Sequence, residues 1–312
     1  MLEREEDIEQ AYFFRVLGER LQEESVILQD LLLSVREEIL ATTRLPMAID
    51  FIATEIKHMG VFGPALKRMG HYFTPFQAFV VEEAERERGR FDLRVALQIL
   101  QREAEYRSQS FAPQGLFLYQ FECLCRNRLR YDPGLAAISN DPFYDAPWKE
   151  WILSVRRRIG MVEIADLIFI RSEYYETAHR LGESRRSYAT DSDEADDSDL
   201  EAGTTPPGPE LPRPTEAEPM EPLFGDREGR IALANRKKDP LLLFAAMQRQ
   251  LGYPAAPRPK PVLNREDQLG GLARQVERME RRIKLLEEEQ KGGIDLTKFF
   301  GPPKEGGAGV AE

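Results

Sequence analysis

The sequence predicts an all-α protein: a globular helical array, then a disordered acidic and proline-rich linker, then a short C-terminal coiled-coil helix. Three observations predict this class. Capping residues, prolines at first turns and glycines after last turns recur along residues 1–182. No run longer than five residues alternates with period two, and no Asn-Gly or Asp-Gly hairpin turn occurs. A change of composition near Tyr188 separates this helical body from an acidic tract and a heptad repeat.

Local start and stop signals place the first helices of the body. Proline at a first turn predicts helices that begin at Pro46 and Pro64. Thr74 with Gln77 three residues later predicts a capping box. The expected helix starts lie near residues 3, 26, 46, 75, 92, 114, 147 and 161, and this uneven spacing argues against a regular helical repeat.

Aspartate caps place the later helices of the body. Asp92 precedes the run Leu93–Arg107, in which apolar residues recur at helical spacing. Asp145 opens a helix that ends near Ile159, and the last helix is expected over residues 161–181.

Residues 183–225 form the expected disordered linker. Between Asp191 and Pro222 there are eleven acidic residues and one basic residue, which accounts for nearly all of the net charge of −11. Such a composition cannot bury a core. Residues 223–264 carry eight basic and three acidic residues, so a positive stretch follows the negative one.

Residues 239–252 form an expected docking helix. Asp239 is its cap, Pro240 occupies its first position and Gly252 follows its end. A helix of about three turns is marginal alone. Its apolar side is therefore expected to dock on its own body or in the groove of a partner. That side consists of Leu243, Phe244, Met247 and Leu251.

Residues 265–291 form the expected coiled-coil helix. Six apolar residues are spaced 3, 4, 3, 4 and 3 apart and occupy heptad positions a and d: Leu269, Leu272, Val276, Met279, Ile283 and Leu286. β-Branched residues at a, with Leu or Met at d, favour two parallel strands. We therefore expect a parallel homodimer. A single amphipathic helix packed on the body is the alternative.

Residues 292–312 form an expected flexible tail with one apolar cluster, Leu296, Phe299 and Phe300. The spacing of these residues resembles the sliding-clamp peptide box, although Gly293 stands where that box has glutamine. We expect the cluster to dock on an unidentified protein partner.

Two of the three histidines lie in E-x-x-H patterns, which place a carboxylate and an imidazole on one side of a helix. Two such pairs with two further glutamates resemble the ferritin-like di-metal carboxylate proteins. The resemblance implies an iron or manganese centre and an oxidoreductase activity as an alternative function; its ligands would be Glu9, Glu55, His58, Glu122, Glu176 and His179. Histidines at the surface or core edge explain the same pattern without any cofactor.

Nucleic-acid binding is a second alternative, because arginine and lysine clusters can contact phosphates. The clusters are Arg126, Arg128 and Arg130; Arg156, Arg157 and Arg158; and Arg236, Lys237 and Lys238. Residues 1–190 nevertheless carry a net charge of −5, so this function is not favoured. The chain has no G-x-x-x-x-G-K-[ST], G-x-S-x-G or paired C-x-x-C motif, which argues against a P-loop NTPase, an α/β hydrolase and a zinc ribbon.

Residues 42–59 (T-T-R-L-P-M-A-I-D-F-I-A-T-E-I-K-H-M) and 119–129 (Y-Q-F-E-C-L-C-R-N-R-L) resemble helical bacterial conserved proteins with no assigned activity. This resemblance implies no chemistry. The sequence has no secretory signal pattern and no apolar run near the roughly 20 residues of a membrane span, so we expect a cytoplasmic protein without a membrane partner. The expected function is a non-catalytic interaction or scaffold protein that self-associates through its heptads.

Overall fold

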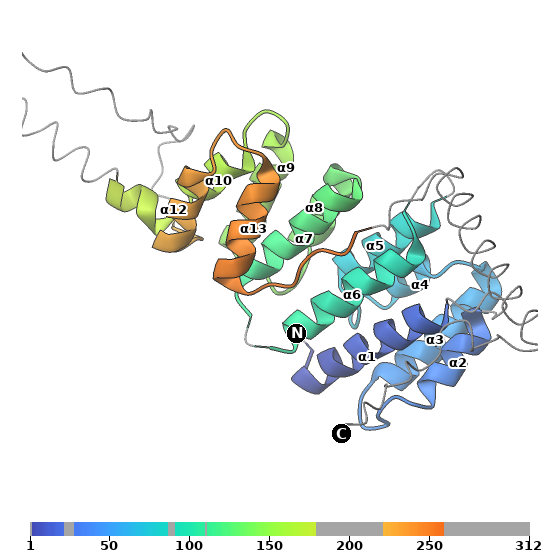
Figure 1. The fold of residues 1–312 in the computed structure, drawn as a ribbon. Coiled ribbons are helices and arrows are strands. Elements are labelled where there is room, and N and C mark those ends of the chain that lie inside the picture. Colours follow the sequence, from blue (N-terminus) through green and yellow to red (C-terminus); the bar gives the residue numbers. More distant parts are fainter. Residues whose placement is uncertain (1, 22–27, 87–90, 110, 179–220, 259–312) are drawn as a thin grey trace, which may run out of the picture. The chain divides into compact units, whose positions relative to one another are not determined.

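The computed structural model of the chain describes residues 2–21, 28–86, 91–109, 111–178 and 221–258. Within these ranges its regular secondary structure is helical, with two isolated β-bridges, and the predicted all-α class is confirmed. Figure 1 shows the helices α1 (Arg4–Arg20), α2 (Leu28–Arg36), α3 (Leu45–Met59), α4 (Gly63–Arg68), α5 (Pro75–Glu85), α6 (Leu93–Arg107), α7 (Pro113–Asn127), α8 (Tyr131–Ser139), α9 (Ala146–Arg158), α10 (Ile164–Ile170), α12 (Asp226–Ala234) and α13 (Pro240–Leu251). None of the helices in the described ranges is long and apolar enough to cross a membrane.

The first helices pack mainly as pairs. α1 lies along α6, α2 contacts α3, and α4 contacts α5 (Figure 1). α5 contacts both α6 and α8, and α8 in turn packs on α9. The apolar side chains of all these helices meet in one continuous core.

The predicted capping residues act as expected. The Gln77 amide N–H donates to Thr74 Oγ1 at 3.2 Å, and the Thr74 N–H donates to Gln77 Oε1 at 3.1 Å, which completes the capping box. The Asp92 and Asp145 carboxylates accept hydrogen bonds from backbone amides in the first turns of α6 and α9. Two of these caps begin α5 and α6, which carry residues of the polar networks described below.

Helix α8 was not predicted from the sequence. Pro133 and Gly134 lie in its first turn and have the composition of a turn. In the structure this glycine lets α8 approach α7 closely, because a β-carbon at Gly134 would lie 2.8 Å from Leu124 Cδ2. Tertiary packing therefore outweighs the local turn preference.

The helix expected over residues 161–181 is interrupted. α10 ends at Ile170, and residues 173–178 are helical again. The Arg171 carbonyl accepts hydrogen bonds from the N–H groups of Leu223 (2.8 Å) and Phe224 (3.0 Å), and the Glu173 N–H donates to the Phe224 carbonyl at 3.0 Å. A segment about fifty residues later in the sequence thus takes hydrogen bonds that a continuous helix would use.

The packed body extends beyond the expected limit at residue 182. Met1–Pro259 forms one compact unit, and residues 221–258 pack on the preceding helices. α12 contacts α10, and α13 contacts both α7 and α12 (Figure 1). The expected linker boundary at residue 225 also differs from the structure, because Leu223 and Phe224 are buried. Charge composition marked the acidic tract but could not show that the basic segment after it returns to the body.

Candidate functional site

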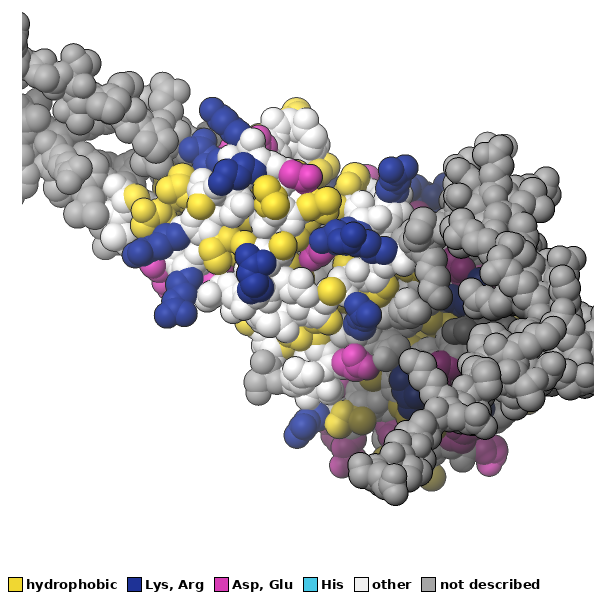
Figure 2. Space-filling model, viewed as in Figure 1, with side chains coloured by type: hydrophobic (Ala, Val, Ile, Leu, Met, Phe, Trp, Pro, Cys, Tyr) yellow, Lys and Arg dark blue, Asp and Glu magenta, His cyan; other side chains and the backbone are white. Residues whose placement is uncertain are grey.

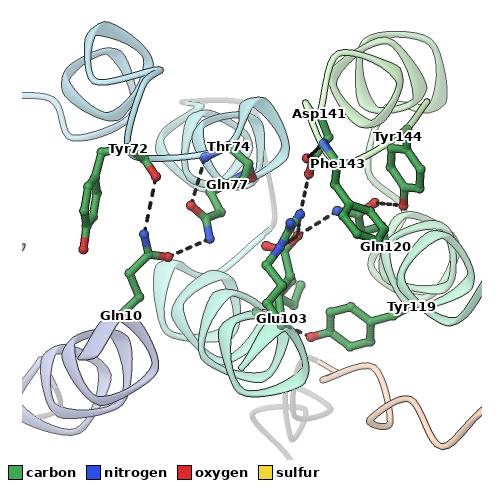
Figure 3. A network of polar contacts seen from close by, with 12 residues as sticks. Gln10, Tyr72, Thr74, Gln77, Glu103, Tyr119, Gln120, Asp141, Phe143 and Tyr144 are labelled. Atoms are coloured by element: carbon green, nitrogen blue, oxygen red, sulfur yellow. Dashed lines mark hydrogen bonds and ion pairs between the residues drawn. The ribbon is translucent and has the colours of Figure 1, made fainter. Parts of the chain in front are cut away.

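A cluster of buried charged side chains lies between α6, α7 and residues 140–144 (Figure 3). Arg107 on α6 forms ion pairs with Glu103, at 3.0 Å, and with Asp141. Glu103 and Asp141 are fully buried, and the Arg107 side chain is 8% exposed. Gln120 from α7 donates to Glu103 Oε1 at 2.7 Å. The cluster joins three parts of the chain through ion pairs and a hydrogen bond.

The cluster contains more negative than positive charge. Two carboxylates share the single Arg107 guanidinium, and Glu103 Oε2 receives no hydrogen bond from any described group. Burial raises the pKa of Glu103 even though Arg107 acts in the opposite direction. Burial also disfavours the charged form of Arg107, but the two neighbouring carboxylates outweigh it and hold the pKa of Arg107 above its usual range, so this guanidinium stays charged.

A second polar network crosses from α1 to α5 (Figure 3). Gln77 Nε2 donates to Gln10 Oε1 at 3.1 Å, and Gln10 Nε2 donates to the Tyr72 carbonyl at 3.5 Å. The Tyr72 hydroxyl donates to Glu6 Oε2 at 2.6 Å. Glu6 Oε1 accepts from the Arg44 amide at 2.9 Å, so both oxygens of this buried carboxylate have partners.

A cavity of about 60 Å³ separates the two networks. Gln10, Tyr72 and Gln77 line one part of it, and Arg107 and Asp141 line another. Asp7, on the first turn of α1, also lines the cavity and is 6% exposed. Burial raises the pKa of Asp7 to about 6, with the nearby charges of Arg107 and Glu103 acting in opposite directions. The cavity with its Asp7 carboxylate is the candidate binding site of this protein.

The residues predicted to hold a metal are not brought together within the described part of the chain. Glu9 accepts a hydrogen bond from the Leu40 amide at 3.1 Å, and Glu55 forms an ion pair with Arg68. Glu122 forms an ion pair with Arg126 and accepts from the Tyr253 hydroxyl. No group of three or more potential ligands occurs among the described residues. His58 is exposed, Glu176 has an interaction partner, and His179 lies outside the described residues.

The residues predicted to dock from α13 lie against the same chain. Leu243, Phe244 and Met247 are each 1% exposed or less, and Leu251 packs against the core. Phe244 meets Phe121 of α7 with ring centroids 6.0 Å apart. The heptad residues 269–286 and the tail residues Leu296, Phe299 and Phe300 lie outside the described residues.

The predicted arginine clusters are partly used inside the protein. Arg126, Arg156 and Arg236 form ion pairs with Glu122, Asp132 and Asp166. Figure 2 shows further Lys and Arg side chains scattered among apolar ones on the face that carries α13. Acidic partners thus neutralise a part of each cluster that was considered for nucleic-acid binding.

Sequence reasoning missed the candidate site. Glu103 lies three residues after Leu100, on the apolar side of the predicted 93–107 helix, and Arg107 follows it at i+4. A charged pair on an otherwise apolar stripe is the signal that could have indicated burial. Asp7 gave no such signal, because acidic residues are common in first turns.

Comparisons with known proteins found no matching family model, no matching curated protein and no matching solved structure.

Proposed function

We propose that this chain is a non-catalytic interaction protein that pairs two folded bodies through the heptads of residues 265–291. The observation that carries the proposal is the uninterrupted 3-4 spacing of six apolar residues from Leu269 to Leu286. A stripe of this kind leaves apolar area exposed on an isolated helix, and a second copy offers a complementary surface.

The docking of residues 221–258 supports the proposal, because it anchors the chain on the body as far as residue 258. Phe224 packs against both Trp148 and Trp151, with ring centroids 5.4 and 5.1 Å away. At the other end of the segment, Asn127 Nδ2 donates to the Pro257 carbonyl at 3.0 Å. The chain is therefore anchored on the body until shortly before the heptads.

Because residues 221–258 are anchored on the body, the acidic tract is not a spacer between the body and the heptads. Residues 179–220 connect two points of the same packed unit, Ala178 and Glu221, so they do not set the distance between a body and its coiled coil. The connection that matters is the stretch from Arg258 to Leu269, which spans at most about 40 Å when fully extended. We propose that self-association holds the two bodies close together, rather than at widely variable distance, and so raises their effective concentration for a shared partner.

Light scattering coupled to size-exclusion chromatography tests the proposal with a matched pair of variants. Leu286 occupies position d, whereas its neighbour Leu285 occupies position c outside the apolar seam. The full-length chain is expected to have the mass of a dimer at micromolar concentration. Leu286→Asp is expected to give a monomer, and Leu285→Asp to remain dimeric. A monomeric wild-type chain, or equal effects of the two variants, would contradict the proposal.

A further inference from the structure

We propose that the cavity beside Asp7 binds a small organic cation, an alkylammonium ion of about five non-hydrogen atoms, with its positive charge against the Asp7 carboxylate. This site is separate from the self-association proposed above, because it lies between α1, α5, α6 and residues 140–144 within one body.

Asp7 is a buried carboxylate without a partner among the described residues. It is 6% exposed and lines the cavity, yet no described group donates a hydrogen bond to its carboxylate or forms an ion pair with it. The adjacent Glu6 is buried to the same degree, and its two oxygens are taken by Tyr72 and Arg44. A desolvated carboxylate that is left unpaired costs folding free energy. A bound cation would supply the missing partner.

The charges around the cavity select for a cation. Arg107 is the basic side chain that lines the cavity from α6, and Glu103 and Asp141 already neutralise it. With Asp7 ionised, the carboxylates of Asp7 and Asp141 line the cavity with one guanidinium, and Glu103 adds a third carboxylate beside that guanidinium. These groups together carry excess negative charge; the exposed His71 also lines the cavity, and the N-terminal amino group lowers the pKa of Asp7. Coulomb interactions are strong where water is largely excluded, and an anion would be repelled.

Aromatic rings form much of the remaining wall. The cavity is lined by Tyr72, Phe73, Phe111 and Phe143. Phe111 and Phe143 come from separate loops, and their ring centroids lie 4.6 Å apart. Aromatic faces attract ammonium groups through their quadrupoles, and they also accommodate methyl groups. Gln10 and Gln77, in the polar part of the wall, hydrogen-bond to each other. A ligand therefore needs few hydrogen-bond donors of its own to satisfy them.

The volume limits the size of the cation. A single water occupies roughly 10–15 Å³ of a cavity measured this way. The cavity of about 60 Å³ therefore holds about four to six water-sized groups. A branched ammonium ion of about five non-hydrogen atoms fills this space, whereas a bare metal ion would leave the aromatic wall without contacts.

Isothermal titration calorimetry of the full-length chain at pH 7 tests the proposal with two ligands of the same shape. tert-Butylammonium carries a charge, and tert-butanol is its neutral counterpart. We expect saturable binding of tert-butylammonium in the millimolar range, because a ligand with so few atoms makes few contacts. Binding of tert-butanol should be at least tenfold weaker. This comparison on the wild-type protein needs no variant, so a failure to fold cannot obscure it.

Variants then locate the binding. Asp7→Asn should weaken tert-butylammonium binding at least tenfold. Glu5→Gln is the matched control, because it removes the same charge from an exposed side chain on the same turn of α1, and it should leave binding unchanged. Equal affinity for the two ligands, no saturation in the millimolar range, or unchanged binding in Asp7→Asn would overturn the proposal. None of these results would bear on the heptad-mediated dimer.

Discussion

The contact of residues 221–258 with the body and the cavity beside Asp7 are built in opposite ways. At the first, Phe224 and Phe244 meet Trp148, Trp151 and Phe121 in a closely packed aromatic interface. At the second, buried carboxylates surround one guanidinium and an opening of about 60 Å³. Apolar packing stabilises a fold directly, whereas buried charge stabilises it weakly or not at all.

This difference separates structural from functional parts of the molecule. The returning segment packs on the body through its aromatic residues, and these account for its position. Among the described residues, no group hydrogen-bonds to the buried Asp7 carboxylate or to Glu103 Oε2, and a core selected only for stability would lack such groups. The first region therefore has the composition of a packing interface, and the second is the region for which we propose ligand binding.

The largest effect is expected from a substitution that disrupts the aromatic interface. Phe224→Ala removes a side chain that is 1% exposed, and it should lower the free energy of unfolding of the 221–258 segment by about 3–5 kcal/mol. Hydrogen exchange followed by mass spectrometry should show faster exchange in α12 and α13 and unchanged exchange in α1–α6. Phe51→Ala, at a half-exposed position on α3, is the matched control and should change neither region. Uniform acceleration along the chain would show that the segment does not open separately.

A smaller effect tests the polar region. Arg107→Met leaves Glu103 and Asp141 buried without their cation and should cost about 2–4 kcal/mol at pH 7, less than a full charge penalty because the carboxylates can protonate. Without Arg107 the pKa of Glu103 rises further above that of the unfolded chain. The loss should therefore shrink as the pH falls from 7 toward 5 in urea unfolding experiments.

The control for this prediction is Arg94→Met on the same helix. Arg94 forms a surface ion pair with Asp92, with side chains 53% and 44% exposed, so its loss should cost less than about 0.5 kcal/mol. Similar costs for Arg107→Met and Arg94→Met would mean that the buried pairs contribute no more than surface ones, and the contrast between the two regions would fail.

The sequence predicted the docking helix and most helix starts, because caps such as Thr74 and Asp239 act through bonds to residues two or three positions away. It did not predict that residues 221–258 return to the body, because that depends on the packing of Phe224 against two tryptophans far away in the sequence. The interruption of the 161–181 helix has the same cause. Local patterns cannot encode such long-range contacts.

The candidate site was not predicted from the sequence for a related reason. Its residues come from α1, α5, α6 and the turn at Asp141, and none of them forms a recognised motif. The residues that looked like a motif, the Glu55 and His58 pair, lie apart from the site: Glu55 bonds to Arg68, and His58 is exposed. In this chain the position of a carboxylate in three dimensions, rather than its spacing in sequence, identifies the site.

The contrast between the aromatic contact of residues 221–258 and the charged cavity is tested most directly by the unfolding free energy of Asp7→Asn, measured as a function of pH. The folded state raises the pKa of Asp7 from 3.8 to about 6, so the folded protein binds this proton more tightly than the unfolded chain. Stability should therefore fall as the pH rises from about 4 to 6, by at most about 3 kcal/mol, and the asparagine variant should lack this loss. We predict that Asp7→Asn equals the wild type near pH 4 and exceeds it at pH 7, while Glu5→Gln follows the wild type throughout. A variant that is less stable than the wild type at pH 7, or a difference that does not change with pH, would contradict the assignment of Asp7 to binding rather than to the fold.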